Sequence, residues 1–451
     1  MPEPTIQSDL SGLLNRYNKP IPRYTSFPTV PHWNFGSISD KSWKDSVGQT
    51  FKAENGEICL YIHLPFCEEL CTYCACNKRI TKNHAVETPY LESVLKEWNL
   101  YRALFSSPPK IREIHLGGGT PTFFSPENLK TLISSILSNS EPLSETDFSV
   151  EVHPNHTRYE HLEVLRNLGF NRISLGIQDF DPAVQFIIHR EQSFEQTKKV
   201  VDWARELGYS SINVDLIYGL PRQTLDSIAF TMEKVGLLRP DRIAFYSYAH
   251  VPWKSKGQRR YTDDDVPKAD EKIEMFITGT GLLKQLGYEN IGMDHFALKE
   301  DPMFRAMKDG TLHRNFMGYT TTNSKLLIGL GASSISDSWE AMVQNEKTVE
   351  LYQEKIEAGQ LPLIDGHFLN RNEQSIRLKI LDLMCGFKTT LSSDFNNDAY
   401  NSRVKNQLIE LEKDGLIEFS NETVRVTDTG RIFIRNVAAA FDPFLMENQL
   451  E

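Results

Sequence analysis

Short apolar runs alternate with longer amphipathic patterns along most of the chain. The runs are rich in β-branched and aromatic residues, and each is followed by a helical pattern of about 12–18 residues. This alternation predicts βα units on a parallel sheet. The strong candidate strands cover residues 58–64, 111–117, 148–154, 172–179, 212–219 and 242–251, and the weaker ones cover 290–297 and 326–336.

Capping residues predict where the intervening helices begin. Thr157 and Glu160 form the pattern of a capping box, in which two side chains bond to backbone amides of the first turn. Ser193 and Gln196 form a second capping box. Ser125, which precedes a proline, is predicted to be the N-cap of a further helix. These signals give the connecting helices definite starts.

The repeated βα units predict an α/β fold. They favour a partial (β/α)6-type barrel over a doubly wound sheet, although periodicity alone does not separate the two folds. In either fold the active site lies at the carboxyl ends of the strands. Polar residues and a glycine-rich turn occur at these strand ends: His63, Gly117 to Thr120, Glu151, Gln178, Asp215, His250 and Asp294.

The chain is expected to have three parts. Residues 1–55 form an N-terminal segment that covers the active site, and residues 56–365 form the partial barrel. Residues 366–451 form a smaller and mostly helical domain. In it, helices at 372–386 and 401–414 lead into the hairpin pattern LIEFSNETVRVT, which resembles a winged-helix unit.

Charge argues against a nucleic-acid partner. The 451 residues carry a net charge of −11, and residues 401–451 hold six basic against nine acidic side chains, which favours a lid or packing domain over a nucleic-acid-binding one. The N-terminus lacks the apolar core of a secretory signal, and no apolar run approaches the roughly 18 residues that span a bilayer. We therefore expect a cytoplasmic protein without membrane partners, in which thiols stay reduced.

Four of the six cysteines fall between positions 67 and 76. Cys67, Cys71 and Cys74 have the spacing C-x3-C-x2-C directly after a predicted strand. Three thiolates on a short loop can each bind one iron of a [4Fe–4S] cube, and the fourth iron then remains open for a small molecule. A zinc site is the main alternative, but structural zinc usually takes two separated pairs of ligands. A disulfide framework conflicts with the cytoplasmic prediction.

The remaining cysteines are not predicted to bind the cluster. Cys76 follows Cys74 after a single alanine, and we expect its side chain to point away from the cube. Cys59 lies in a strand pattern and Cys385 in an apolar stretch, and we expect both to be small core residues.

Seven motifs together resemble the oxygen-independent coproporphyrinogen III dehydrogenases (oxidases) of the radical SAM superfamily. They run through nearly the whole chain in family order: RYTSFPT (23–29), YIHLPFCEELCTYCACNK (61–78), GGGTPTFF (117–124), GIQDF (176–180), NVDLIYGLPRQT (213–224), GMDHFA (292–297) and HRNFMGYTT (313–321). The related haem-chaperone branch shares the cysteine spacing, but it is typified by a C-x2-C-x-F loop where this chain has Cys74-Ala75-Cys76. The chaperones also lack the first and last of these motifs. A haem-binding trafficking protein and a zinc-stabilised regulatory domain are the alternative functions.

The resemblance implies a reaction of haem synthesis. Two propionates of coproporphyrinogen III become vinyl groups, which gives protoporphyrinogen IX, and two molecules of S-adenosylmethionine (SAM) are consumed with release of two CO2. A one-electron donor such as flavodoxin or ferredoxin reduces the cluster, and a 5′-deoxyadenosyl radical abstracts hydrogen from the substrate. The resemblance also implies a monomer that binds two SAM molecules.

Residue roles also follow from the resemblance. Tyr61 packs near the first SAM, Gly117 meets its methionine amino group beside Gly118, Gly119 and Thr120, and Glu151 accepts hydrogen bonds from the ribose. The second SAM site is lined by Gln178, Arg190, Asp215, Ala249 and Ile335, and Tyr73 contributes backbone contacts. His63 shares a strand face with Tyr61, and both are candidate catalytic residues.

The substrate carries four propionates and needs cationic partners. The candidates are Arg23, Lys78, Arg79, His313 and Arg314. Met317 stands where the family resemblance leads us to expect a glutamine, so any contact of this side chain with substrate or SAM is apolar in this protein.

Overall fold

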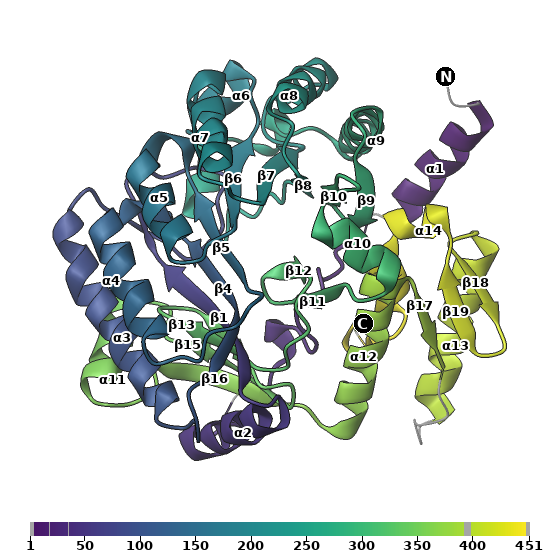
Figure 1. The fold of residues 1–451 in the computed structure, drawn as a ribbon. Helices are drawn as coiled ribbons and strands as arrows, with labels where there is room; N and C mark the ends of the chain where they lie inside the picture. The colour runs from purple at the N-terminus through teal and green to yellow at the C-terminus, as the bar shows by residue number, and fades with distance from the viewer. Residues whose placement is uncertain (1–3, 18, 35, 392–397, 448–451) are drawn as a thin grey trace. The chain divides into compact units, whose positions relative to one another are not determined.

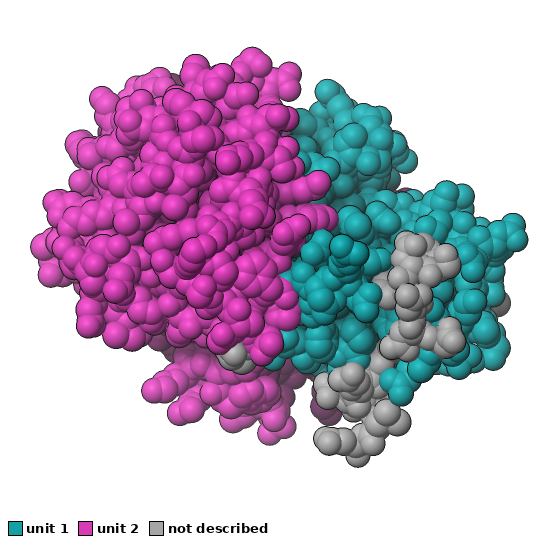
Figure 2. All heavy atoms as spheres, turned by 90° about the horizontal axis from the view of Figure 1, so that it is seen from below, with its two compact units in different colours: residues 1–33, 288–323, 369–451 teal, residues 34–287, 324–368 magenta. Residues whose placement is uncertain are grey.

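The computed structural model describes residues 4–17, 19–34, 36–391 and 398–447 (Figure 1). The chain forms two compact units, each assembled from separate stretches of sequence (Figure 2). Unit 1 comprises residues 1–33, 288–323 and 369–451, and unit 2 comprises residues 34–287 and 324–368. The division of the chain into the three domains expected from the sequence stays a prediction.

A parallel sheet forms the centre of unit 2 (Figure 1). Its main strands lie side by side in chain order, which is the order of a partial barrel, whereas a doubly wound sheet reverses its order. All six strong predicted strands are confirmed. They are β1 (Glu57–Leu64), β4 (Lys110–Gly118), β5 (Asp147–Val152), β6 (Arg172–Gln178), β7 (Ser211–Tyr218) and β8 (Arg242–Ser247).

Helices connect these strands and cover the outer side of the sheet (Figure 1). This placement is the one that parallel strands require, because each chain crossover must return to the same end of the sheet. The connecting helices are α3 (Glu87–Arg102), α4 (Pro126–Leu137), α5 (Tyr159–Asn167), α6 (Pro182–Ile187), α7 (Phe194–Glu206) and α8 (Leu225–Leu238), and α2 (Asp40–Ala53) and α9 (Ala269–Gln285) also belong to unit 2.

The sheet continues beyond β1 on its other side. β13 (Leu327–Leu330) is parallel to β1, and β14 (Ile335–Asp337), β15 (Ala341–Asn345) and β16 (Leu363–Phe368) follow in antiparallel order. The weak candidate at 326–336 is therefore two strands. β15 and β16 escaped prediction because their apolar patterns are short, and α11 (Val349–Glu357) joins them.

The predicted helix starts are partly confirmed. The capping box of Ser193 and Gln196 opens α7 as expected. The box expected from Thr157 and Glu160 is wrong. Thr157 Oγ1 instead donates to His153 O at 2.8 Å, and α5 starts later, where His161 Nδ1 accepts from Arg158 N at 3.0 Å. The amide of Arg158 is thus capped by a histidine, which is outside the usual capping set.

Unit 1 contains the winged-helix-like part. The predicted helices and hairpin of this part are confirmed, and an additional strand completes a three-stranded antiparallel sheet in the order β17-β19-β18. The elements are α12 (Arg371–Gly386), β17 (Lys388–Thr390), α13 (Asp398–Lys413), β18 (Ile417–Ser420), β19 (Thr423–Val426), α14 (Asp428–Ile432), α15 (Ile434–Ala439) and α16 (Pro443–Glu447).

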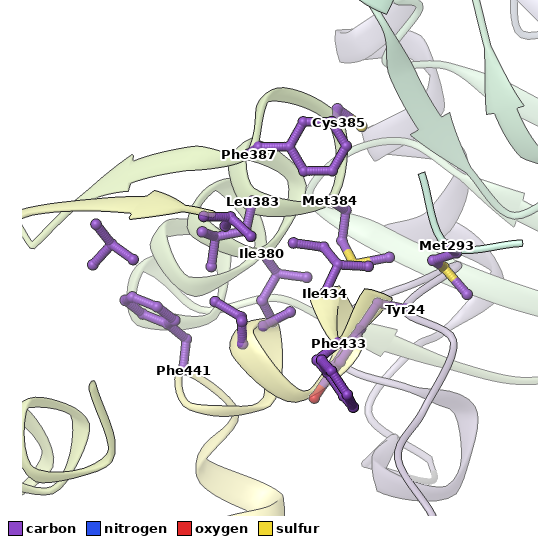
Figure 3. Close-up of a cluster of buried hydrophobic side chains, with 14 of the residues drawn as sticks. Tyr24, Met293, Ile380, Leu383, Met384, Cys385, Phe387, Phe433, Ile434 and Phe441 are labelled. Atoms are coloured by element: carbon purple, nitrogen blue, oxygen red, sulfur yellow. The ribbon is translucent and has the colours of Figure 1, made fainter. Parts of the chain in front are cut away.

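Segments from three regions of the chain share the core of unit 1. Figure 3 shows Tyr24 from the N-terminal segment and Met293 from the middle segment among side chains of α12 and α15. Cys385 belongs to this core, and Cys59 is buried in β1, so both are core residues as predicted. The other elements of unit 1 are α1 (Pro4–Tyr17), β9 (Glu289–Gly292), β10 (His295–Ala297), α10 (Pro302–Asp309), β11 (His313–Asn315) and β12 (Gly318–Thr320).

Two further predictions concern the candidate strand at 290–297 and the possibility of a membrane-spanning helix. The weak candidate at 290–297 is an antiparallel hairpin of β9 and β10 instead of one strand, because Met293 adopts a positive φ of 48° between them. In the part of the chain that the structure describes, no helix combines the length and the apolar character needed to span a bilayer.

α4 illustrates how the helices are fixed on the sheet. Ser125 accepts from Asn128 N at 3.2 Å and Pro126 occupies the first turn, so the predicted start is confirmed. The buried side chains recur at intervals of three and four residues and form one apolar stripe. They are Leu129, Leu132, Ile133 and Ile136.

Leu132→Ala is expected to lower the free energy of unfolding by about 2–5 kcal/mol, because it removes buried methyl groups and leaves a cavity. Leu237 on α8 is 62 % exposed, so Leu237→Ala is a matched control that should change the free energy of unfolding by less than about 0.5 kcal/mol. Urea unfolding followed by tryptophan fluorescence measures both. Equal losses for the two variants would contradict the prediction.

Candidate functional site

A cavity of about 280 Å³ lies in unit 2 between the cysteine loop and the carboxyl ends of β4 to β7. Most residues predicted for the site line it, although they come from positions spread over about 150 residues of sequence. They are Cys67, Cys71, Tyr73, Cys74, Gly118, Gly119, Thr120, Glu151, Gln178, Arg190 and Asp215. The tertiary structure therefore brings them to one place, as expected for a parallel sheet.

The cysteine loop, residues 67–78, lies between two very short parallel strands, β2 (Phe66–Cys67) and β3 (Arg79–Ile80). Other segments hold its backbone. Gln258 Nε2 donates to Tyr73 O at 2.9 Å, and Ser255 Oγ donates to Cys74 O at 3.1 Å. Because these bonds satisfy the backbone carbonyls, the loop keeps a fixed shape without regular secondary structure.

The three thiols of the loop fit an iron–sulfur cube. They line one cavity, yet among the described residues no three His, Cys, Asp or Glu side chains gather closely enough to hold a single metal ion. A cube gives each thiolate its own iron and therefore suits three thiols spread around one cavity. Cys67, Cys71 and Cys74 are all free cysteines. The donor set thus suits a [4Fe–4S] cluster with one open iron.

Hydrogen-bond donors surround the thiols. Thr120 Oγ1 donates to Cys67 Sγ at 3.4 Å, and Arg190 Nη1 donates to Cys71 Sγ at 3.4 Å. A hydrogen bond from Cys76, together with the Lys78 ammonium, lowers the pKa of Cys74 to about 6. Burial raises the pKa of Cys67 to about 11, so binding of iron at this thiol releases a proton.

Cys76 corrects one expectation. Its side chain was expected to point away from the cluster thiols. Instead it lines the same cavity, and its thiol forms a hydrogen bond with the Cys74 thiol. The reason is that Ala75 separates Cys74 from Cys76, and side chains two positions apart share one face even in an extended segment.

The glycine turn after β4 requires residues without a side chain. Gly118 has a φ of +113°, and a Cβ there would lie 2.7 Å from the His63 ring. A Cβ on Gly119 would lie 2.6 Å from the carbonyl of Pro65. Backbone this close to the strand before the cysteine loop is possible only for glycine. The turn therefore forms a wall of bare backbone beside the thiols.

Glu151 at the end of β5 supplies a carboxylate to this wall. It accepts from Gly118 N at 3.3 Å and bonds to His115 Nε2 at 3.3 Å. Burial acts to raise the pKa of Glu151, but the hydrogen bonds from His115 and Gly118 outweigh it and lower the pKa. Glu151 therefore stays ionised and can accept hydrogen bonds from ligand hydroxyl groups.

Arg190 is the buried cation of the cavity. Its Nε and Nη2 donate to Gly176 O at 3.2 and 2.5 Å, and its third bond goes to Cys71 Sγ. Burial acts to lower the pKa of Arg190, but the neighbouring Tyr73 and Cys71 raise it above its ordinary value. A guanidinium has five N–H groups, so two of them remain for a ligand carboxylate.

Two further polar groups accompany Arg190. Gln178 follows a bulge in β6 and has a φ of +68°. Asp215 accepts from Ser174 Oγ at 3.2 Å and from Asn213 Nδ2 at 2.9 Å, and burial raises its pKa to about 6. The cavity thus holds an anionic group on β5, a cation beside β6 and a weakly acidic carboxyl on β7.

Tyr61 and His63 are buried and lie outside the lining of the cavity. His63 Nε2 is 2.9 Å from Asn77 O, so this nitrogen donates, and Nδ1 accepts from Tyr61 OH at 3.0 Å. Burial lowers the pKa of His63, which favours this neutral form. The pair connects β1 to the end of the cysteine loop, and its catalytic role stays a prediction.

Besides Tyr61, three predicted cofactor residues do not line the cavity. Gly117 is buried, and a Cβ there would lie 3.1 Å from the Glu151 carboxyl group. Ala249 is exposed and offers its carbonyl to Gln258 at 3.3 Å. Ile335 is buried in β14 and pairs with β15. Their contacts with SAM stay predictions from the resemblance.

Sequence reasoning missed several residues that support the site. His115 stacks on Tyr61 with ring centroids 5.9 Å apart and bonds to Glu151, and Asn213 bonds to Asp215. Both precede a predicted site residue by two positions on the same strand face, which is the signal that could have found them. Gly176 was also missed as an individual residue, and the cavity shows its role: a Cβ there would lie 2.7 Å from Gln178 Nε2 and 2.8 Å from Arg190 Nη2.

The cations predicted to bind substrate are distributed over both units. In unit 2, Lys78 lines the cavity and donates to Cys74 O at 2.9 Å, while Arg79 forms an ion pair with Glu350. In unit 1, Arg23 pairs with Asp294, and Arg314 Nη2 donates to Arg23 O at 3.1 Å.

The last cation of this set, His313, and the apolar candidate Met317 both belong to unit 1. His313 is on β11, and Met317 precedes β12, with its backbone N donating to Asn315 Oδ1 at 2.9 Å. Substrate contacts of all these residues stay predictions.

A buried network supports the strand that leads into the cysteine loop. Tyr90 of α3 donates to His63 O at 2.8 Å and accepts from Ala332 N at 2.9 Å. On the same helix, Glu97 is fully buried and accepts from Gly331 N at 2.8 Å. Burial raises the pKa of Glu97 to about 7. The loop after β13 is therefore fixed to the end of β1 through one helix.

Glu97 makes stability depend on pH. Between pH 4.5 and about 7 the carboxyl ionises in the unfolded chain but stays protonated in the folded protein, so the free energy of unfolding falls as the pH rises. We expect this loss to be on the order of 1–3 kcal/mol. Glu97→Gln removes the ionisation, and the variant should lose less stability than the wild type between pH 5 and 7.5. Urea unfolding at both pH values measures this, and parallel losses would refute it.

Comparisons with known proteins agree with this geometry. Residues 61–235 match the family model described as the radical SAM superfamily. The chain is 39 % identical to the oxygen-independent coproporphyrinogen III oxidase of Pseudomonas aeruginosa, over 98 % of this chain and 97 % of that protein. It is 35 % identical to the oxygen-independent coproporphyrinogen III oxidase of Escherichia coli, over 98 % of this chain and 96 % of that protein.

A solved structure extends the likeness to the fold. The coproporphyrinogen III oxidase of Escherichia coli, described as a radical SAM enzyme, matches with a TM-score of 0.88 and 36 % identity, over 94 % of this chain and 97 % of that one. The match confirms the predicted α/β fold.

Proposed function

The chain belongs to the oxygen-independent coproporphyrinogen III oxidases, which are radical SAM oxidoreductases, and we propose that it converts coproporphyrinogen III to protoporphyrinogen IX. In this reaction two propionates become vinyl groups, two SAM molecules are consumed and two CO2 are released. The enzyme acts as a monomer in the cytoplasm and receives electrons from a carrier such as flavodoxin or ferredoxin.

One observation carries the proposal. Three thiols, a glycine turn and an ionised carboxylate face the same cavity: Cys67, Cys71, Cys74, Gly118, Gly119 and Glu151. This combination suits a cluster with an open iron and an adjoining ligand that has amino, carboxylate and hydroxyl groups. SAM has all three kinds of group. When bound, the cluster and SAM supply a 5′-deoxyadenosyl radical able to take hydrogen from a propionate.

The residues of the chain bind and orient the reactants. Cys67, Cys71 and Cys74 hold the cluster, and the donors Thr120 and Arg190 stabilise two of the thiolates. The bare backbone of the glycine turn admits the methionine end of SAM. Glu151 accepts hydrogen bonds from its ribose, because its carboxylate stays ionised. Tyr61 and His63 fix the strand before the loop through their hydrogen bond.

A second SAM site is proposed beside the first. Arg190 has two N–H groups left for a carboxylate, and Asp215 and Gln178 offer acceptors and donors within the same cavity. Tyr73, Ala249 and Ile335 complete this site in the proposal. The propionates of the substrate pair with cations from the set Arg23, Lys78, Arg79, His313 and Arg314, and Met317 gives the substrate an apolar contact.

An anaerobic assay tests the function. Protein reconstituted with iron and sulfide should be brown, with broad absorbance at about 400 nm. A protein that binds zinc instead shows no such absorbance. With a reductant, SAM and coproporphyrinogen III it should form 5′-deoxyadenosine and the divinyl product. Cys71→Ala should abolish both the absorbance and the product, whereas Cys385→Ala in the core of unit 1 should keep the absorbance.

The outcomes separate the alternatives. Absence of a cluster from the wild type would refute the whole proposal and favour a zinc site. Formation of 5′-deoxyadenosine without decarboxylation would refute the substrate, and haem binding without SAM cleavage would favour a trafficking protein.

Gly176→Ala tests the cavity beside β6. The new Cβ collides with Gln178 and Arg190 at less than 3 Å, so the two side chains must move. We expect binding of SAM to weaken at least about tenfold, which corresponds to about 1.4 kcal/mol. Gly281→Ala on α9 is the control, because nothing lies within 4 Å of a Cβ there. Equilibrium dialysis with labelled SAM measures the affinity of both variants. Equal affinities would contradict the prediction, because the collision would then be relieved without weakening the binding of SAM.

A further inference from the structure

Residues 249–262 follow β8 and pack against the cysteine loop. Two of their side chains bond to backbone carbonyls of that loop, Gln258 to Tyr73 O and Ser255 to Cys74 O. Gly257 approaches Thr72 so closely that a Cβ would lie 3.1 Å from Thr72 O. This segment therefore touches the stretch that carries a proposed cluster ligand, and no other residue separates the two.

The same segment exposes cationic and aromatic side chains. Trp253 is 71 % exposed, the largest value among the exposed large hydrophobic residues that the structure describes. Four cations are exposed around it, three of them on the short 3-10 helix η5 (Lys256–Arg260). We name these residues, together with Phe186, the basic loop surface: Phe186, Trp253, Lys254, Lys256, Arg259 and Arg260.

A small core joins this surface to the cysteine loop. Val184, Ile188, Tyr248 and Tyr261 are buried together, and Tyr73 packs against them. Phe186 of α6 stands between the core residues Val184 and Ile188 in the chain, is 60 % exposed, and has the Arg260 guanidinium 5.7 Å from its ring centroid. The basic loop surface is therefore part of the packed framework of the loop, and its position relative to the thiols is fixed.

The charge of this surface differs from that of the protein. The chain carries a net charge of −11, yet residues 249–262 contain four Lys or Arg and no Asp or Glu. Asp263, Asp264 and Asp265 follow directly, so the four cations exceed these neighbouring carboxylates by one; Asp265 accepts from Thr262 N at 3.0 Å, and Asp263 lies 3.5 Å from His250 Nε2. Clustered cations in an acidic protein create a local positive field, and this field attracts an acidic partner to the surface.

We propose that the basic loop surface is the docking site of a small acidic one-electron carrier protein. The inference rests on the proposed function, because it assumes a cluster at the cysteine loop. In the step, the carrier is oxidised by one electron and the cluster is reduced by one, and no bond or proton is exchanged. An acidic carrier is repelled by most of this acidic chain, so the positive surface selects the docking orientation. Exposed Trp and Arg are the residue types that small interfaces use as anchors.

Charge reversal tests the proposal on the full-length, reconstituted enzyme. Formation of 5′-deoxyadenosine is measured against the concentration of reduced flavodoxin at low salt, with SAM and coproporphyrinogen III present. Lys254→Glu/Lys256→Glu should raise the KM for flavodoxin at least about tenfold, and added salt should shrink this difference. Trp253→Ala should raise the KM by at least about threefold without any change of charge.

Two controls separate docking from other effects. Lys52→Glu/Lys130→Glu makes the same charge change at exposed positions on α2 and α4, and its KM for flavodoxin should stay within about twofold of the wild type. With photoreduced 5-deazaflavin, a small neutral reductant, all variants should form 5′-deoxyadenosine at the wild-type rate, since docking is then not needed.

The results that overturn the proposal are distinct from those that overturn the function. An unchanged KM for Lys254→Glu/Lys256→Glu, or an equal rise in the control double variant, would refute the docking site. A loss of rate with 5-deazaflavin in the Lys254→Glu/Lys256→Glu variant would also refute it, because the surface would then act on the site itself. Failure of the wild type to form 5′-deoxyadenosine with 5-deazaflavin would refute the proposed function.

Discussion

The three proposed cluster ligands lie on a loop with no helix or strand between Cys67 and Arg79, so its shape depends on hydrogen bonds from distant segments. Tyr73 and Cys74 are held through their carbonyls by side chains that follow β8, and Cys71 is held through its thiol by Arg190 beside β6. Because these bonds come from two different βα units, one after β6 and one after β8, the ligand geometry exists only when the strands are in register. The barrel is therefore the template of the thiol arrangement, and the rest of the site is built around it.

Close packing supplies the second constraint. At Gly118, Gly119 and Gly176 a single added carbon would lie less than 3 Å from a neighbouring atom. The glycines let the backbone at the end of β4 approach His63 and Pro65, and the backbone of β6 approach Arg190, to a distance that no side chain allows. The cavity is thus shaped by missing side chains as much as by polar ones.

The electrostatics of the cavity follow from burial and from the partners that offset it. Glu151 and Asp215 are both carboxyl groups at strand ends, but their pKa values shift in opposite directions. Glu151 has His115 and the amide of Gly118 as donors, and its pKa is lowered. Asp215 has only neutral side-chain donors, and burial raises its pKa to about 6. One carboxyl is therefore a fixed anion, and the other responds to small changes in its surroundings.

The sequence by itself determined the six main parallel strands, the order of their βα units, the cysteine spacing and the residues at the strand exits, because these depend on local periodicity and on residue type. Glu151 and Asp215 were found in this way, since a parallel sheet places all strand exits at one edge. Only the tertiary structure decided which side chains fix the cysteine loop, namely Arg190, Ser255 and Gln258. These bonds join groups that are distant in sequence, so they form only when the strands have come together.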